Sequence, residues 1–189
     1  MIFTGTLDNS GATTIDQKAV ALIRSCAEAA GWITRLSTVT GENHEWLGEG
    51  PGLSGTEKIY AGVRSYRTVS TSNYKLSGAI FTGFVDGRAY AQQPGILDSY
   101  SYLGRDLDIK LDHLLTRYYI FVNAQRITAV FVGSTNNAYV FHAGKFFQFA
   151  FPTEYPYPVV MLSSQDGSGP FRSSGSYMFR PALVSAYLS

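Results

Sequence analysis

The stretch IDQKAVALIRSCAEAAGWITRLSTVT, Ile15–Thr40, decides the fold, because its hydrophobic period changes at Gly31. Thr13 or Thr14 can cap a helix, Gly31 can end it, and apolar or small residues recur between them at helical spacing: Ile15, Ala19, Leu22, Cys26, Ala29 and Ala30. After Gly31 the period becomes two, and β-branched and aromatic residues dominate. This predicts one N-terminal helix followed by β-structure.

The strand pattern continues in HEWLGEG (44–50), KIYAGVRSYRTV (58–69) and YKLSGAIFTGFV (74–85). In the second of these segments the inward face should consist of Ile59, Ala61, Val63 and Ser65. Residues 86–105 are rich in Gly, Tyr, Ser and Gln without a sustained period, which indicates a long loop and a place for contacts. LDIKLDHLL (107–115) fits either a short helix or an extended stretch.

The second half predicts a three-stranded meander, with strands in YYIFVNAQRITAVFVG (118–133) around residues 123–125 and in NNAYVFHAGKFFQFAF (136–151). The proline-rich PTEYPYPVVML (152–162) should be extended and unable to serve as a central strand. Residues 163–189 form a Ser/Gly-rich tail with a short strand near its end, and residues 1–12 an extended N-terminal arm. We therefore predict one α+β domain over residues 1–189, with one N-terminal helix packed on a predominantly antiparallel sheet or sandwich with long loops.

Composition narrows the function classes. Of the 189 residues, 45% are hydrophobic and only 15% charged, with a formal net charge of +1. Uncharged polar side chains must then supply much of the surface, which mildly favours assembly with partners. A duplex nucleic-acid binder needs a clustered basic face. The longest local excess of Lys and Arg alternates with tyrosines that could stack on bases (Lys58, Arg64, Arg67 and Lys75 with Tyr60, Tyr66 and Tyr74), but ordinary exposed strand faces explain it better, and we expect no nucleic-acid partner.

Neither the N-terminal residues nor any later stretch has the pattern of a signal peptide or a membrane span, so we expect neither. The single cysteine, Cys26, lies among alanines in the helical pattern. It should be a buried packing residue and not a catalytic thiol.

The stretch GEGPGLSGTEKIYAG, Gly48–Gly62, tests for a phosphate-binding loop. Gly50 and Gly55 have the spacing of that motif, but the lysine arrives only at Lys58 and a strand pattern follows where a helix is needed. We expect a tight turn between the Trp46 strand and the Tyr60 strand, with Thr56 and Glu57 beside it as positions to inspect for a subunit contact.

The sequence signals for catalytic and metal-binding motifs are equally weak. The histidines His44, His113 and His142 lie in separate contexts, and no serine elbow or zinc-ligand spacing accompanies them. For His142, a strand histidine bonded to a neighbour is the expectation. Four acids flank Trp46 and could form a glycosidase pair, but solvent-facing acids on a strand and a turn explain them better: Glu42, Glu45, Glu49 and Glu57. We expect no catalytic, cofactor-binding or metal-binding residues.

The aromatic content of 13 Tyr, 12 Phe and 2 Trp also fits a sugar-binding module. Many of the phenylalanines fall in apolar strands and are more simply core residues: Phe121, Phe131, Phe141, Phe146, Phe147, Phe149 and Phe151. Carbohydrate binding therefore stays open as an alternative.

From about Gly31 to Met161 the chain resembles uncharacterised structural proteins encoded in the tail gene clusters of tailed bacteriophages and prophages. The resemblance is carried by EWLGEGPGLSGTEKIYAGVRSY (45–66), FTGFVDGRAYAQQPG (81–95) and YYIFVNAQRITAVFVGSTNNAYVFHAGKFFQFAFPTEYPYPVV (118–160). It brings no catalytic motif with it.

The resemblance implies a non-enzymatic subunit of a phage tail or baseplate, assembled in the host cytoplasm and located in the virion. Such a subunit would form a homo-oligomeric ring and bind other tail or baseplate proteins. Extended arms and sheet edges suit such contacts, and residues 1–12 and the PTEYPYP segment (152–158) are the candidates. The alternative is a receptor- or carbohydrate-binding module at the tail tip, and a cell-wall hydrolase is a further rival.

Overall fold

The structure is a computed structural model. It describes residues 1–40, 43–53, 55, 57–68, 73–98, 108–111, 115–134, 136–145, 159–164 and 178–181.

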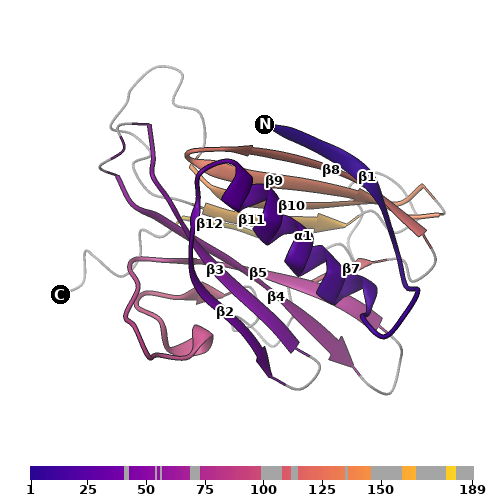
Figure 1. Cartoon of the computed structure of the whole chain (residues 1–189), viewed down its shortest axis with the longest axis horizontal. Coiled ribbons are helices and arrows are strands. Elements are labelled where there is room, and N and C mark those ends of the chain that lie inside the picture. Colours follow the sequence, from indigo (N-terminus) through magenta and orange to yellow (C-terminus); the bar gives the residue numbers. More distant parts are fainter. Residues whose placement is uncertain are drawn as a thin grey trace.

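The fold consists of two antiparallel sheets and one long helix (Figure 1). Sheet A contains, in spatial order, β1 (Ile2–Asp8), β8 (Leu115–Asn123), β9 (Arg126–Val132), β10 (Ala138–Gly144), β11 (Val159–Ser164) and β12 (Met178–Pro181). Sheet B contains β2 (Ile33–Thr40), β3 (Asn43–Gly50), β4 (Ile59–Thr68), β5 (Asn73–Phe81) and β6 (Leu97–Asp98), while β7 (Asp108–Leu111) also pairs with β5. The α+β prediction is confirmed.

The helix α1 (Ile15–Ala29) begins and ends where the sequence predicts. At its start the backbone N–H of Thr14 donates to Gln17 Oε1 (3.1 Å), and that of Ile15 donates to Asn9 Oδ1 (3.0 Å). These bonds satisfy donors that a helix N-terminus leaves without a partner in the helix. At the other end Gly31 adopts a positive φ of 90°, the left-handed conformation that commonly stops a helix.

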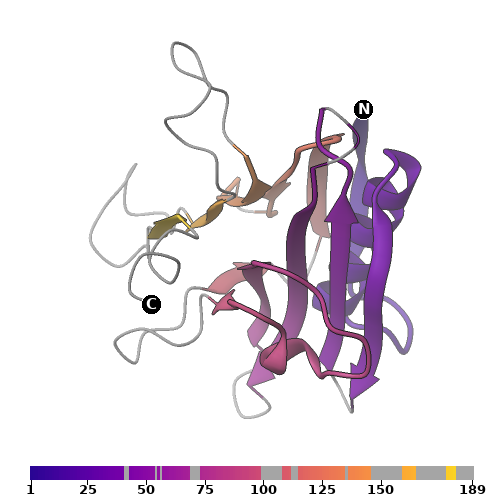
Figure 2. The same ribbon diagram turned by 90° about the vertical axis from the view of Figure 1, so that its left-hand side faces the viewer.

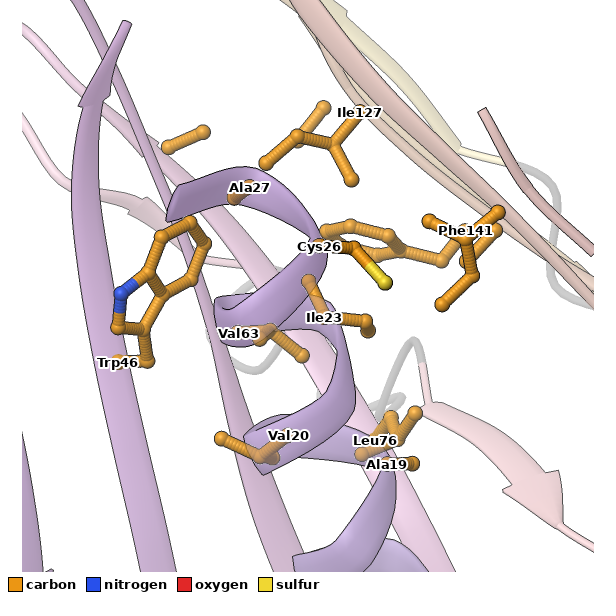
Figure 3. Packing of buried hydrophobic residues seen from close by; sticks show 14 of the residues in the cluster. Ala19, Val20, Ile23, Cys26, Ala27, Trp46, Val63, Leu76, Ile127 and Phe141 are labelled. Carbon is orange, nitrogen blue, oxygen red and sulfur yellow. The ribbon is translucent and has the colours of Figure 1, made fainter. Parts of the chain in front are cut away.

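The main hydrophobic core lies where α1 meets the inner faces of both sheets (Figure 3). The sheets contact each other directly through β10 and β11 against β5 and β7, whereas α1 contacts β1 and β8 of sheet A and β2–β5 of sheet B. Figure 2 shows α1 and the first strands of sheet B on one side of the molecule and the later strands of sheet A on the other. The helix therefore fills the end at which the two sheets separate.

Two tryptophans connect this core to the strands. Trp46 is fully buried, and its indole N–H donates to Thr34 Oγ1 (2.8 Å). Trp32, which is 3% exposed, donates its indole N–H to the carbonyl of Asn123 in sheet A (2.8 Å). The ring centroids lie 6.5 Å apart. Both buried indoles thus have partners for their polar atoms, and one of them joins the two sheets.

The outer face of sheet B is also covered. A smaller buried cluster contains Leu47, Ala79, Phe81 and Tyr90, the last from the 3₁₀ turn η1 (Tyr90–Gln92). Gln93 is 2% exposed, and its amide bonds both the N–H and the carbonyl of Val85 (2.9 and 3.1 Å). Of the loop predicted over residues 86–105, Tyr90 and Gln93 are therefore buried, residues 97–98 form the strand β6, and residues 99–105 lie outside the described residues.

Other elements match or correct the sequence predictions. The meander is confirmed as β8, β9 and β10, and 107–115 contains the strand β7. The expectation that 152–162 cannot supply a central strand is wrong for its last residues, because β11 lies between β10 and β12. All three prolines precede β11, so its N–H groups remain available for pairing. The strand near the end of the tail is confirmed as β12.

The core predicts a sharp contrast between two valines on strands. Val63 of β4 is fully buried against α1, whereas Val39 of β2 is 66% exposed. We expect Val63→Ala to lower the free energy of unfolding by about 2 kcal/mol, because it removes two buried methyl groups and leaves a cavity. Val39→Ala changes strand propensity in the same way and should cost less than about 1 kcal/mol. Urea unfolding measures both, and equal losses would contradict the described core.

Candidate functional site

The glycine-rich turn after β3 docks on the β8–β9 hairpin of the other sheet. The N–H of Gly52 donates to the carbonyl of Ala124 (2.9 Å). Lys145, at the end of β10, donates its N–H to the carbonyl of Gln125 (3.0 Å). The prediction that this stretch connects two neighbouring strands is confirmed, because β3 and β4 are paired, but the connection spans residues 51–58 and is longer than a tight turn. The turn joins the two sheets of one chain.

Glu57 has a partner within the same chain. Its carboxylate forms an ion pair with the ammonium of Lys145, and the side chain of Lys145 is only 13% exposed. The position that the sequence marked for a possible subunit contact thus helps to hold the turn against sheet A. Thr56 lies outside the described residues.

Gly52 allows a test of this docked turn. Its φ is +67°, and an added Cβ would lie 2.5 Å from the Cβ of Glu57. We expect Gly52→Ala to cost about 3 kcal/mol of unfolding free energy, through the left-handed backbone and the clash together. Gly55 in the same turn has φ +73° with open space around it, so Gly55→Ala should cost only about 1 kcal/mol. Chemical denaturation compares the two, and a smaller loss for Gly52→Ala would contradict the described conformation of the turn.

The two acids on β3, Glu45 and Glu49, each contact a neighbouring strand or cation. Glu45 accepts a bond from the Thr38 hydroxyl (3.0 Å). Glu49 is only 7% exposed and accepts from Arg35 Nε (2.7 Å), with Lys58 Nζ 3.7 Å away. The hydrogen bond from Arg35 lowers the pKa of Glu49 below its usual value. The expectation of solvent-facing acids is therefore wrong for Glu49, because its carboxylate is buried beside Arg35 of the neighbouring strand β2.

Spacing along β3 also bears on hydrolysis. Glu45 and Glu49 are four residues apart on one strand, about 13 Å at 3.3 Å per residue. A retaining glycosidase separates its two carboxyl groups by about 5 Å and an inverting one by at most about 9.5 Å. Leu47 lies between the two acids in the smaller core cluster, and Trp46 points into the main core. This pair does not have the geometry of a glycosidase, and Glu42 lies outside the described residues.

The basic and tyrosine residues of the alternating segment divide between the two faces of sheet B. Tyr74 is buried in the main core, where its hydroxyl accepts a bond from Asn9 (2.9 Å). Tyr60 instead packs beside the smaller cluster on the opposite face. The guanidinium of Arg64 lies over the ring of Tyr90, 5.9 Å from its centroid. Tyr60 and Tyr74 thus cannot stack on successive bases from one face.

Cys26 and His142 are both buried. Burial raises the pKa of the Cys26 thiol to about 11, which suits the predicted packing role. His142 of β10 is 5% exposed, and its Nδ1 lies 2.8 Å from the Thr128 hydroxyl of β9, so the predicted bond to a neighbour is confirmed. Burial, and secondarily the charge of Arg126, lower the pKa of His142 to about 4. His113 lies outside the described residues.

The lowered pKa of His142 predicts a dependence of stability on pH. Below pH 6.5 the unfolded chain protonates this histidine, but the folded chain does so only near pH 4. Stability should therefore fall by about 3 kcal/mol as the pH falls from 6.5 to 4. Urea unfolding across this range should show a shallower slope for His142→Gln than for the native chain. Equal slopes for the native chain and His142→Gln would contradict the assignment.

Exposed apolar side chains gather near the edge strands of the two sheets. Beside β1, the exposed fractions are 66% for Met1, 68% for Ile2, 38% for Tyr119 and 42% for Phe121. Ile2 and Phe121 are cross-strand partners. A pocket of about 260 Å³ lies here and is lined by Met1, Phe121, Val122, Asn123, Arg126 and Thr128. The expectation that Phe121 is a core residue is wrong, whereas Phe131 and Phe141 are fully buried as predicted.

The second exposed edge belongs to sheet B, where Ile33 of β2 is 52% exposed and Val39 is 66% exposed. In Figure 1 the strands β1 and β2 lie on opposite sides of α1. Within the described part of the chain, β1 pairs only with β8, and β2 only with β3. Residues 1–12 thus include a docked edge strand, and residues 152–158 lie outside the described residues. These two edges, with their apolar side chains, are the candidate functional site.

Sequence reasoning missed Tyr119 and Phe121 because both faces of β8 carry large apolar residues. Alternation places Ile120 and Val122 inward and Tyr119 and Phe121 outward. An uninterrupted apolar run looks like a strand buried on both faces. The strand order shows what the sequence pattern does not: in the described part of the chain, the side chains of Tyr119 and Phe121 remain exposed.

Comparison with protein-family models and with curated proteins found no match. The described residues hold no helix long and apolar enough to cross a membrane. Nor do those residues bring together three or more metal-ligating side chains of His, Cys, Asp or Glu.

Proposed function

We propose that this protein is a structural subunit of a tailed-phage virion, in the tail or baseplate, which oligomerises and binds other virion proteins. The observation that carries the proposal is the pair of sheet edges, β1 and β2, with exposed apolar side chains beside them. Exposed apolar surface of this kind favours association with other proteins. The assignment to a phage tail rests on the resemblance of residues 31–161 to tail-cluster proteins.

The arrangement of the edges suits a ring. In a ring each copy presents one surface to a different surface of its neighbour. The exposed residues Tyr119 and Phe121 beside β1 differ from the exposed Ile33 on β2, and the strands β1 and β2 lie on opposite sides of α1 (Figure 1). The chain therefore carries two different apolar surfaces, as a ring contact requires.

The charged residues of the described chain support an assembly role over catalysis. Glu49 pairs with Arg35, Glu57 with Lys145, and Asp8 with Lys18. Each of these pairs holds two segments of the chain together. These ion pairs contribute to the fold. The exposed apolar residues at the sheet edges are therefore the more distinctive feature of the surface.

A receptor- or carbohydrate-binding module is the alternative, and the pocket beside Phe121 and Arg126 is the observation that favours it. An aromatic ring next to polar side chains can hold a sugar. Trp32 and Trp46, however, are both buried in the core and cannot form an exposed stacking row. The alternative therefore rests on Tyr119 and Phe121 alone among the large aromatic side chains that the structure describes as exposed.

Assembly predicts a concentration-dependent rise in molar mass and the presence of the protein in particles. Size-exclusion chromatography with light scattering, together with mass spectrometry of purified virions, measures both. We expect Phe121→Ser or Ile33→Ser to reduce the oligomer fraction by at least about tenfold, because each removes exposed apolar surface from an interface. Val85→Ser removes a 38% exposed valine from the loop after β5 and should leave assembly unchanged.

A strictly monomeric protein that is absent from particles would contradict the proposal. Binding of a cell-surface glycan by a monomeric chain, lost on Phe121→Ser, would support the alternative instead.

A further inference from the structure

In the part of the chain that the structure describes, strand β1 presents an edge without the usual protection. Natural edge strands are commonly protected from pairing with other chains by Lys, Pro or a bulge. The sequence IFTGTL, residues 2–7, contains neither residue, and the register of β1 with β8 is continuous. Strand β2, by contrast, has an irregular register between Thr34 and Leu36 and carries Arg35 there. Of the two edges in the candidate site, β1 is therefore the one open to backbone pairing.

The backbone groups available on this edge follow from the pairing with β8. The N–H of Val122 donates to the carbonyl of Met1 (3.0 Å), and the backbone nitrogen of Met1 donates to the carbonyl of Val122 (2.6 Å). In an antiparallel ladder such exchanging pairs alternate along the strand. Phe3, Gly5 and Leu7 therefore bond to β8, and the N–H and C=O groups of Ile2, Thr4 and Thr6 point to the open side.

The side-chain pattern of β1 is symmetric about Gly5. Phe3 and Leu7 lie on the inner face, where both are half-buried and pack against the main core. Thr4 and Thr6 lie on the outer face and are exposed. Read in either direction, the strand is apolar, Thr, Gly, Thr, apolar.

We propose that β1 pairs antiparallel with β1 of a second copy, about a two-fold axis at Gly5. In this register Thr4 lies opposite Thr6 of the second copy, and both use their outward backbone groups. Phe3 lies opposite Leu7 of the second copy on the inner face, so an apolar pair forms on each side of the axis. Cross-strand pairs of this kind, Thr with Thr and aromatic with aliphatic, stabilise sheets.

Other registers fit less well. A shift of one residue would place the outward backbone groups of one copy opposite residues whose groups already bond to β8. A shift of two that places Phe3 opposite Gly5 removes both Phe3–Leu7 pairs and leaves Leu7 opposite Met1, before the first residue of the strand. At the end of the strand, Asp8 is held by Lys18 Nζ (2.9 Å) and by the Ser10 hydroxyl (2.6 Å), so the pairing is confined to Phe3–Leu7.

The pairing goes beyond the proposed ring. A ring contact joins two different surfaces, whereas this contact joins a surface to itself and closes at two copies. It joins two six-stranded sheets into one continuous sheet. It can hold two subunits together whether or not either belongs to a virion.

The test introduces charged side chains of either sign at Thr4 and Thr6, on the outer face of β1. In Thr4→Lys/Thr6→Lys each lysine lies opposite a lysine of the second copy, and in Thr4→Glu/Thr6→Glu each glutamate lies opposite a glutamate. We expect each variant alone to raise the dimer dissociation constant at least about tenfold at low salt. An equimolar mixture should recover a heterodimer, because every lysine then lies opposite a glutamate. Sedimentation velocity measures the dimer in each sample.

Controls separate this contact from folding and from other assembly. Ala91→Lys/Gln92→Lys adds the same charge at two exposed positions of η1 and should leave the dimer unchanged. Circular dichroism and thermal unfolding should show all variants folded, because Thr4 and Thr6 are exposed. Amide hydrogen exchange at rising concentration should show new protection at Thr4 and Thr6.

A native chain that stays monomeric at all concentrations would overturn the pairing, as would a dimer insensitive to the lysine variant or a mixture that fails to recover. Presence of the protein in virions without β1 protection would overturn the pairing and leave the proposed function standing. A β1 dimer formed by a chain that is absent from virions would support the pairing and contradict the proposed function.

Discussion

The packing of α1 between two separating sheets is the constraint on which the rest of the structure depends. The sheets touch directly through β10, β11, β5 and β7, and toward β1 and β2 the helix occupies the space between them. Small residues on its buried face, Ala19, Cys26 and Ala27, let the helix approach both sheets closely. Because one apolar face must serve two sheets, residues from distant strands share a single core. The helix also leaves the outer edges of β1 and β2 on opposite sides of the molecule.

The sequence was enough to predict the helix, its ends, the strands from Ile33 to Phe81 and the central meander, because each depends on local periodicity and caps. Contacts between distant residues left no such signal. The pairing of Glu57 with Lys145 and of Trp32 with Asn123 depends on how the sheets meet, which periodicity does not specify. The same holds for Tyr90, whose loop looks polar and yet covers the outer face of sheet B. The sequence predicted only what kind of site to expect, an extended arm or a sheet edge. It did not predict the exposure of Phe121, because that exposure follows from strand order.

The charged side chains of the described chain largely act on the chain itself. Arg35 forms an ion pair with Glu49, Lys145 with Glu57 of the glycine-rich turn, and Lys18 with Asp8 at the end of β1. With a formal net charge of only +1, little long-range repulsion keeps copies apart. Weak repulsion and exposed apolar edges act in the same direction, toward association.

The pairing of β1 with β8 also has a consequence for the order of folding. Met1 and Val122 are bonded although they are 121 positions apart in the chain. A contact of such long sequence separation forms late, because a large loop must close before the strand is held. During synthesis β1 leaves the ribosome long before β8 exists, so both of its edges are open for that interval. During that interval β1 is open to pairing with a wrong strand, and it offers an extended apolar segment to chaperones.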